Sequence, residues 1–261
     1  MSDTQRPIRL WYQSFVDPEI HRPYFEILKA HLERIADPAT EIGISGIVPP
    51  STHLHRLTEA RCARQVLRNA LQAEHEGFDG FAIGHFQEGG IADVKSAVDI
   101  PVLGLGEAAM HYACLLGHRF GLITIDPIYI PWHEDQIRLH GLEGRAAGVR
   151  AVKTSPADYM AAFQDDAARA SVVAQFEAAA APLLASGAEV LIPAGGLPML
   201  LLCSDPELRI GGAPVLNGVS VLLKLAEAAV KLRRTDGIGI SRKAGFAKPS
   251  PEGLREYLDH P

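Results

Sequence analysis

Short apolar segments alternate with longer amphipathic segments along this 261-residue chain, and this alternation limits its fold more than any other feature. In the first half, four apolar runs have the length and composition of strands, at residues 8–15, 41–48, 78–84 and 102–105. The segments between these runs predict helices at residues 22–35 and 58–76 and a short helix before the fourth run, and residues 107–116 after it predict another helix. Thr58 is a candidate N-cap for the second of these helices.

The same plan returns in the second half. Strands are predicted at residues 120–125, 149–153, 189–194 and 215–216, and helices at residues 131–140, 167–186 and 219–233. Strands separated by helices of this length predict right-handed crossovers and parallel sheets with helices on both faces. The fold class is therefore α/β, with two parallel-sheet halves whose strand ends face a shared cleft, which is where such sheets bind ligands.

Composition argues against several classes of function. The net charge of −6 gives no electrostatic reason to expect nucleic acid or an anionic membrane as a partner. No apolar stretch is long enough to span a bilayer, and residues 1–7 lack the apolar core of a signal peptide, so we predict a cytoplasmic protein. Its three cysteines, Cys62, Cys114 and Cys203, are too scattered for a disulfide framework and are interpreted as small buried apolar residues.

A histidine follows the predicted strand at residues 78–84. His85 is succeeded by a glycine-rich turn through Phe86, Gln87 and Glu88 to Gly90. An imidazole titrates near neutral pH and can act as a general acid or base without a special environment. The turn after it can present backbone N–H groups to a carboxylate or enolate oxygen of a substrate. The sequence therefore predicts that His85 is catalytic and that Phe86 and Gln87 bind substrate.

Several stretches, in order along nearly the whole chain, resemble those of one enzyme superfamily. They lie at residues 78–84, 100–109, 116–124, 187–192, 217–219, 224–227 and 241–247. On these residues the chain resembles the aspartate/glutamate/hydantoin racemase superfamily, and within it the hydantoin racemase branch.

The resemblance implies two Rossmann-like halves related by a pseudo-twofold, with the active site in the cleft between them. The implied halves are residues 1–112 plus 213–261 and residues 113–212. It also implies a homo-oligomer that acts on a small molecule and needs no cofactor. In this superfamily a cysteine at the end of a strand in each half removes or returns a proton alpha to a carbonyl group, and two such groups on opposite faces of one carbon invert it.

This chain departs from that pattern at both cysteine positions. His85 stands at the first position, and the second falls at about Gly195, beside Gly196, where no side chain is available. None of the three cysteines is predicted at either strand end. The sequence therefore predicts proton transfer by His85 in place of a thiol.

Further site residues follow from the resemblance. Gln13 and Ser14 occupy the place of an Asn-Pro-Asn motif that holds the substrate in the family, and Glu107 and Thr124 match positions near the family's active site. Together with Gly195 and Gly196, they are the predicted substrate-binding residues. Structural roles explain the presence of these polar residues equally well. Gln13 and Ser14 can hydrogen-bond to the backbone at the strand end, and Glu107 can be a favourable charge at a helix N-terminus.

A metal site is an alternative. His53 and His55 are spaced so that both side chains of an extended segment point the same way, and with His85 they make a candidate three-ligand zinc site, with Glu59 or Glu88 behind it. A pair of this spacing is a frequent accident in a chain with 11 histidines, so a surface location is favoured and no metal is predicted.

The sequence thus predicts a cofactor-independent racemase or isomerase that acts on a small carboxylate, an amino-acid derivative or a hydantoin-like cyclic amide. Three alternatives stay open. They are a metal-assisted or histidine-dependent hydrolase of a cyclic amide or imide, a decarboxylase or other lyase, and a small-molecule binding protein without catalytic activity.

Overall fold

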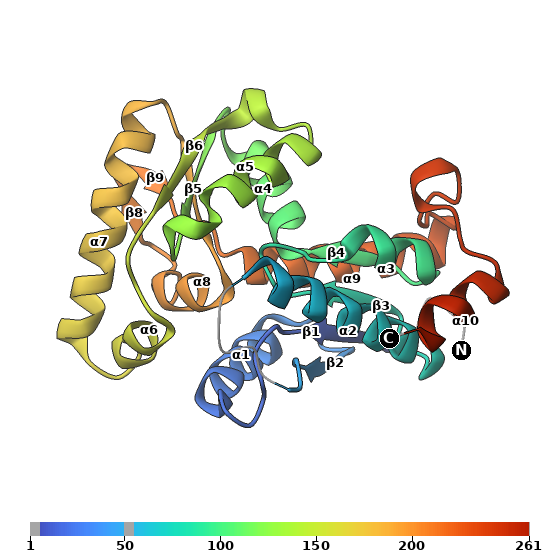
Figure 1. Cartoon of the computed structure of the whole chain (residues 1–261). Coiled ribbons are helices and arrows are strands. Elements are labelled where there is room, and N and C mark those ends of the chain that lie inside the picture. The colour runs from blue at the N-terminus through green and yellow to red at the C-terminus, as the bar shows by residue number, and fades with distance from the viewer. Residues whose placement is uncertain (1–5, 50–54, 261) are drawn as a thin grey trace.

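A computed structural model describes residues 6–49 and 55–260 of the chain. Its first half contains a four-stranded parallel sheet in the order β2-β1-β3-β4 (Figure 1). The strands are β1 (Ile8–Gln13), β2 (Thr40–Ser45), β3 (Gly80–Ile83) and β4 (Val102–Gly104).

The second half repeats this topology. The strands β5 (Phe120–Thr124), β6 (Ala146–Ala151) and β7 (Val190–Ala194) form a parallel sheet in the order β6-β5-β7. Val215 makes an isolated parallel bridge to Leu191 of β7, so a short fourth strand stands where β4 stands in the first sheet. The predicted α/β fold with two parallel-sheet halves is confirmed.

Helices cover both sheets. They are α1 (Arg22–Ile35), α2 (Arg56–His75), α3 (Ile91–Ala97), α4 (Leu105–Leu116), α5 (Ile130–Leu139), α6 (Pro156–Ala162), α7 (Asp166–Ala185), α8 (Gly196–Leu202), α9 (Gly218–Asp236) and α10 (Pro251–Asp259). Smaller elements are the 3-10 turns η2 (Pro127–Tyr129), η3 (Glu143–Arg145) and η4 (Ala244–Phe246) and an antiparallel pair, β8 (Arg209–Ile210) and β9 (Ala213–Pro214). None of the helices in the described ranges is both long and apolar enough to cross a membrane.

Several predicted boundaries differ from the observed ones by two or three residues, and two of these differences have clear local reasons. The helix predicted from Thr58 begins at Arg56, because the His55 side chain caps it by accepting a hydrogen bond from the Leu57 N–H, at 3.2 Å. The strand predicted through residue 48 ends at Ser45. At Gly46 a Cβ atom would lie only 2.2 Å from the Val16 carbonyl oxygen, so the chain turns there at a point that only glycine allows.

Side chains of the first sheet alternate between two cores. Tyr12 and Ala82 face the large core that α1, α4 and α9 also line, whereas Trp11, Phe81 and Ile83 face the core beneath α2 and α3. This alternation sets the direction of the residues that follow β3.

The C-terminal part of the chain returns to the first half. Helix α9 packs against α4, β3 and β4, and α10 reaches α2 (Figure 1). The Arg64 guanidinium of α2 lies over the Tyr257 ring of α10. The domain boundaries given above stay a prediction.

A partly buried ion pair ties α9 to the start of the first sheet. Asp79, just before β3, accepts hydrogen bonds from the Arg9 N–H at 2.9 Å and pairs with Arg234 at 3.0 Å. The side chains of Asp79 and Arg234 are 9% and 8% exposed. Removing the carboxylate would therefore leave the Arg234 guanidinium buried without its charged partner.

We therefore expect Asp79→Ala to lower the free energy of unfolding by about 3 kcal/mol in a denaturant titration. Glu41→Ala is the matched control, because Glu41 is 71% exposed and lies 3.8 Å from Arg9. It should cost less than about 1 kcal/mol. Equal losses in the two variants would contradict this assignment.

Candidate functional site

His85 is held by a carboxylate and an aromatic ring. Its Nε2 lies 3.1 Å from both carboxylate oxygens of Glu59, a residue of α2. Its ring stacks on Phe15, with centroids 4.0 Å apart and planes inclined by 8°. The His85 side chain is 20% exposed and that of Glu59 8%, so the imidazole is fixed in orientation and still reaches solvent.

The contact with Glu59 determines the tautomer of His85. Burial opposes ionisation of Glu59, but the neighbouring His85 outweighs burial, and the pKa of the Glu59 carboxyl falls below its usual value. An ionised carboxylate only accepts hydrogen bonds, so Nε2 of His85 carries a proton and donates it to Glu59. In the neutral ring the lone pair is then on Nδ1, which is the atom able to take a proton from a substrate.

The sequence was interpreted to place Glu59 only behind a hypothetical metal site, although its position in the helix indicates that it has a buried polar partner. The buried residues of α2 recur at helical spacing, as Glu59, Cys62, Val66, Ala70 and Ala73. A carboxylate at the head of an otherwise apolar stripe requires a buried partner, since an isolated buried charge is costly. That requirement alone predicts a polar residue opposite Glu59.

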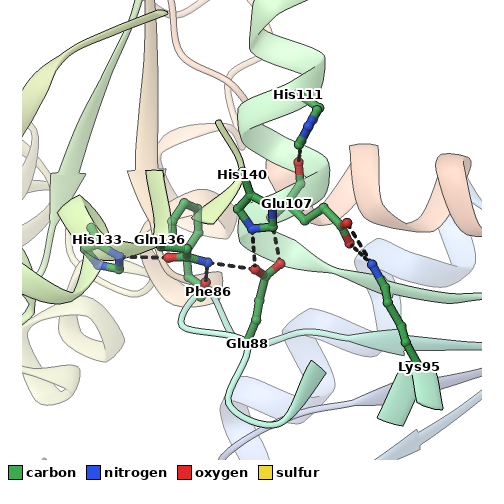
Figure 2. Close-up of polar contacts among 8 residues, drawn as sticks. All are labelled: Phe86, Glu88, Lys95, Glu107, His111, His133, Gln136 and His140. Atoms are coloured by element: carbon green, nitrogen blue, oxygen red, sulfur yellow. Dashed lines mark hydrogen bonds and ion pairs between the residues drawn. The ribbon is translucent and has the colours of Figure 1, made fainter. Parts of the chain in front are cut away.

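The turn after His85 is anchored to the second half through Glu88. Its carboxylate accepts hydrogen bonds from the Glu107 N–H in the first turn of α4 at 2.6 Å and from Gln136 Nε2 of α5 at 2.7 Å (Figure 2). His140 Nε2 lies 3.4 Å from the same carboxylate. Glu88 is buried and has a φ of 54°, a backbone conformation that few non-glycine residues adopt. These contacts fix the position of the loop that carries His85.

Two glycines make room for this anchor. A Cβ atom at Gly104 would lie 1.9 Å from Glu88 Oε1, and one at Gly106 would lie 2.3 Å from Gln136 Nε2. The two glycines therefore admit a buried carboxylate and a carboxamide beside the start of α4.

Gln136 also sets the tautomer of a second, buried histidine. Its amide nitrogen donates to the Phe86 carbonyl at 2.6 Å, so its oxygen faces His133 Nδ1, at 3.2 Å. His133 therefore carries its proton on Nδ1, and Nε2 accepts from the Thr124 hydroxyl at 3.2 Å. Burial lowers the pKa of His133 to about 4, so the ring is neutral at neutral pH.

Two of the predicted substrate-binding residues, Gln13 and Ser14, already have hydrogen-bond partners within the chain. Gln13 is fully buried, and its amide bonds Trp11, Asn69, the Ser14 carbonyl and the Gly46 carbonyl. Substrate binding by Gln13 would require one of these bonds to break. Ser14 is buried and its side chain hydrogen-bonds to Tyr24.

The other predicted substrate-binding residues are also held by contacts with neighbouring side chains or by burial. Glu107 pairs with Lys95 of α3 at 2.7 Å, Phe86 packs edge-on against His133, and Thr124 is fully buried beneath that ring. Gln87 is 9% exposed. Whether any of these residues contacts substrate stays a prediction.

The carboxyl ends of the two sheets approach each other. Gly195 and Gly196 follow β7, and a Cβ atom at residue 196 would lie 4.0 Å from the Gly84 carbonyl oxygen, at the end of β3. His85 and Gly195, the residues predicted at the two family cysteine positions, therefore follow strand ends that meet between the halves.

The three cysteines lie away from these strand ends. Cys62 is buried on α2, Cys114 is on α4 and Cys203 follows α8. Burial raises the pKa of the Cys114 thiol and raises that of Cys203 to about 12, which disfavours the reactive thiolate in both.

The candidate zinc ligands are only partly described. His53 lies outside the described residues, and His55 uses Nδ1 to cap α2. Within residues 6–49 and 55–260, no three His, Cys, Asp or Glu side chains are grouped so that they could hold a metal ion. The absence of a metal stays a prediction.

Comparison with known proteins identifies the family. The sequence profile described as Asp/Glu/Hydantoin racemase matches residues 23–226. The chain belongs to this family. It is 31% identical to a hydantoin racemase of Rhizobium meliloti over 172 residues, which are 65% of this chain and 68% of that protein. It is 28% identical to a hydantoin racemase of Paenarthrobacter aurescens over 87% of this chain and 94% of that protein.

Solved structures agree. An allantoin racemase from Pseudomonas fluorescens superposes with a TM-score of 0.77 at 26% identity, over 94% of this chain and 98% of that one. An allantoin racemase from Klebsiella pneumoniae gives a TM-score of 0.75 at 25% identity, over 93% and 94% of the two chains. The chain is thus a racemase-family enzyme with the family's fold.

The buried neutral His133 predicts a pH dependence of stability. Its pKa is about 4 in the folded chain against an ordinary value of 6.5, so the unfolded chain binds the proton more tightly. Stability is then fully present above about pH 6.5 and declines as the pH falls towards 4, by an amount on the order of 3 kcal/mol from this residue. His31, whose pKa burial also lowers to about 4, adds to the decline.

We expect His133→Gln to flatten the plot of unfolding free energy against pH between pH 7 and 4. The exposed His75 provides the control, and His75→Gln should leave the slope unchanged. An unchanged slope in His133→Gln would show that folding does not shift the pKa of His133, and it would contradict this assignment.

Proposed function

We propose that this enzyme racemises a small cyclic amide of the hydantoin type, by proton transfer at the carbon alpha to a ring carbonyl, with His85 as a proton-transfer group. The observation that carries this proposal is the His85–Glu59 pair, which follows the end of β3. The hydantoin racemases and allantoin racemases among its relatives support the substrate class. A cytoplasmic location and a homo-oligomeric state stay predictions.

The geometry of the pair defines the chemical step. Nδ1 of His85 takes the proton from the substrate carbon, and the electron pair of the C–H bond moves into the carbonyl group to form an enolate. The imidazolium that results is stabilised by the Glu59 carboxylate, which accepts its Nε2–H. Stacking on Phe15 keeps the ring in one plane, so the proton is taken from one face of the substrate.

Exchange of the substrate C–H proton with deuterium in heavy water, followed by proton NMR, tests the proposal on both enantiomers of 5-substituted hydantoins and of allantoin. We expect wild type to exchange and to racemise. His85→Gln should lower both rates by at least about 10²-fold, because general acid–base groups contribute about 10²–10⁴-fold. Glu59→Gln should lower kcat and shift its pH profile, because the amide cannot stabilise the imidazolium.

The control is the triple variant Cys62→Ala, Cys114→Ala, Cys203→Ala, which should remain active. Loss of activity in the folded triple variant, or on thiol alkylation of folded wild type, would contradict a histidine mechanism. Ring opening or carbon dioxide release without racemisation would instead assign the His85–Glu59 pair to hydrolysis or decarboxylation. Loss of activity in chelator, restored by zinc, would favour the metal alternative.

A further inference from the structure

Inversion of a carbon needs a proton-transfer group on each face, and His85 supplies only one. The position that carries the second thiol in the family falls at Gly195, and Gly196 beside it also lacks a side chain. If the enzyme racemises a substrate that keeps one orientation, a polar group from another element or a water molecule must reach the second face.

A hydroxyl group lies at this place. A Cβ atom at residue 196 would lie 2.7 Å from the Tyr24 hydroxyl oxygen, so the tyrosine side chain from α1 fills the space that a side chain at the end of β7 would occupy. The same Cβ atom would be 4.0 Å from the Gly84 carbonyl oxygen, so the Tyr24 hydroxyl is close to the ends of both sheets.

Tyr24 and His85 lie on opposite sides of the end of β3. A Cβ atom at Gly84 would point at the Tyr12 ring and hydroxyl, on the core that α1 and Tyr24 share. His85, one residue later, points instead to Glu59 of α2. A flat substrate placed beyond this strand end would therefore present one face to the imidazole and the other to the Tyr24 hydroxyl.

The surroundings of Tyr24 contain unused hydrogen-bonding capacity. The Tyr12 hydroxyl is fully buried next to Gly84 and has no hydrogen-bond partner in the described part of the chain. Buried hydroxyls are almost always paired, so this hydroxyl is available to an oxygen or nitrogen atom of a bound molecule or of an ordered water. Tyr24 itself is hydrogen-bonded to the Ser14 side chain.

We propose that Tyr24 is the second proton-transfer group, acting on the substrate face opposite His85; this rests on the racemase function proposed above. His85 Nδ1 takes the proton from one face, and the electron pair forms the enolate. The Tyr24 O–H bond then breaks, its proton bonds to the carbon on the other face, and the electron pair stays on the phenolate oxygen. Proton exchange with water after product release returns imidazole and phenol to their resting forms.

The resting protonation state makes the two groups unequal. Burial raises the pKa of Tyr24 to about 12, although the Ser14 hydrogen bond opposes this rise, so the phenol is protonated at neutral pH. Tyr24 is therefore ready to donate a proton, whereas His85 is ready to accept one. Removing Tyr24 should therefore affect the two enantiomers differently, whereas removing His85 should affect both alike.

The test compares Tyr24→Phe with wild type in deuterated water, for each enantiomer separately. We expect racemisation to fall by at least about 10²-fold. The enantiomer whose proton faces His85 should still exchange that proton for deuterium, with retention of configuration, while the other enantiomer should not exchange. His85→Gln should abolish exchange of both.

Tyr159→Phe is the matched control, because Tyr159 is another buried tyrosine with a side-chain hydrogen bond, to Thr154, and it packs in a separate small core with α8 rather than in the core of α1. It should exchange and racemise like wild type. Full racemisation by Tyr24→Phe, or equal loss of exchange from both enantiomers in the folded variant, would overturn the assignment and leave the racemase function standing. Absence of exchange by wild type would overturn the proposed function and the role of Tyr24 with it.

Discussion

The contact between the Glu59 carboxylate and the imidazole of His85 is the interaction on which the chemistry proposed for this enzyme depends. It converts a histidine at a strand end into a base with a defined free nitrogen and a stabilised protonated form. A thiol at this position needs a lowered pKa to act as a base, whereas an imidazole is already suited to neutral pH. In the proposed mechanism, His85 therefore transfers the proton that a thiol transfers in the family, with Glu59 as its supporting residue.

The position of that base depends in turn on contacts between the two halves. Glu88, three residues after His85, bonds to the start of α4 and to Gln136 of α5, and Gln136 orients His133 against Thr124. These buried polar groups satisfy one another, so the loop has little freedom to move independently of either half. Because each group is paired and buried, this network stabilises the arrangement of the two sheets as well as the loop.

The fold could be predicted from the sequence because apolar runs and helical spacing report it directly, and the two parallel sheets followed from their alternation. His85 was found because it follows a strand. Its partner Glu59 was not assigned, because a contact across 26 residues of chain leaves only an indirect signal, a charge in an apolar stripe. Tyr24 gave no separate signal, because a tyrosine on the buried face of α1 has the same spacing whether it belongs to the core or to a site.

The tautomer of His85 is the most direct measure of this mechanism. Nitrogen-15 NMR of protein labelled at histidine, with His85→Gln to assign the signals, distinguishes a protonated ring nitrogen from an unprotonated one. At neutral pH the expected result is a proton on Nε2 and a free lone pair on Nδ1 of His85, with the opposite tautomer in His133. A His85 ring protonated on Nδ1 and free on Nε2 would contradict its pairing with Glu59 and the base that this pairing creates.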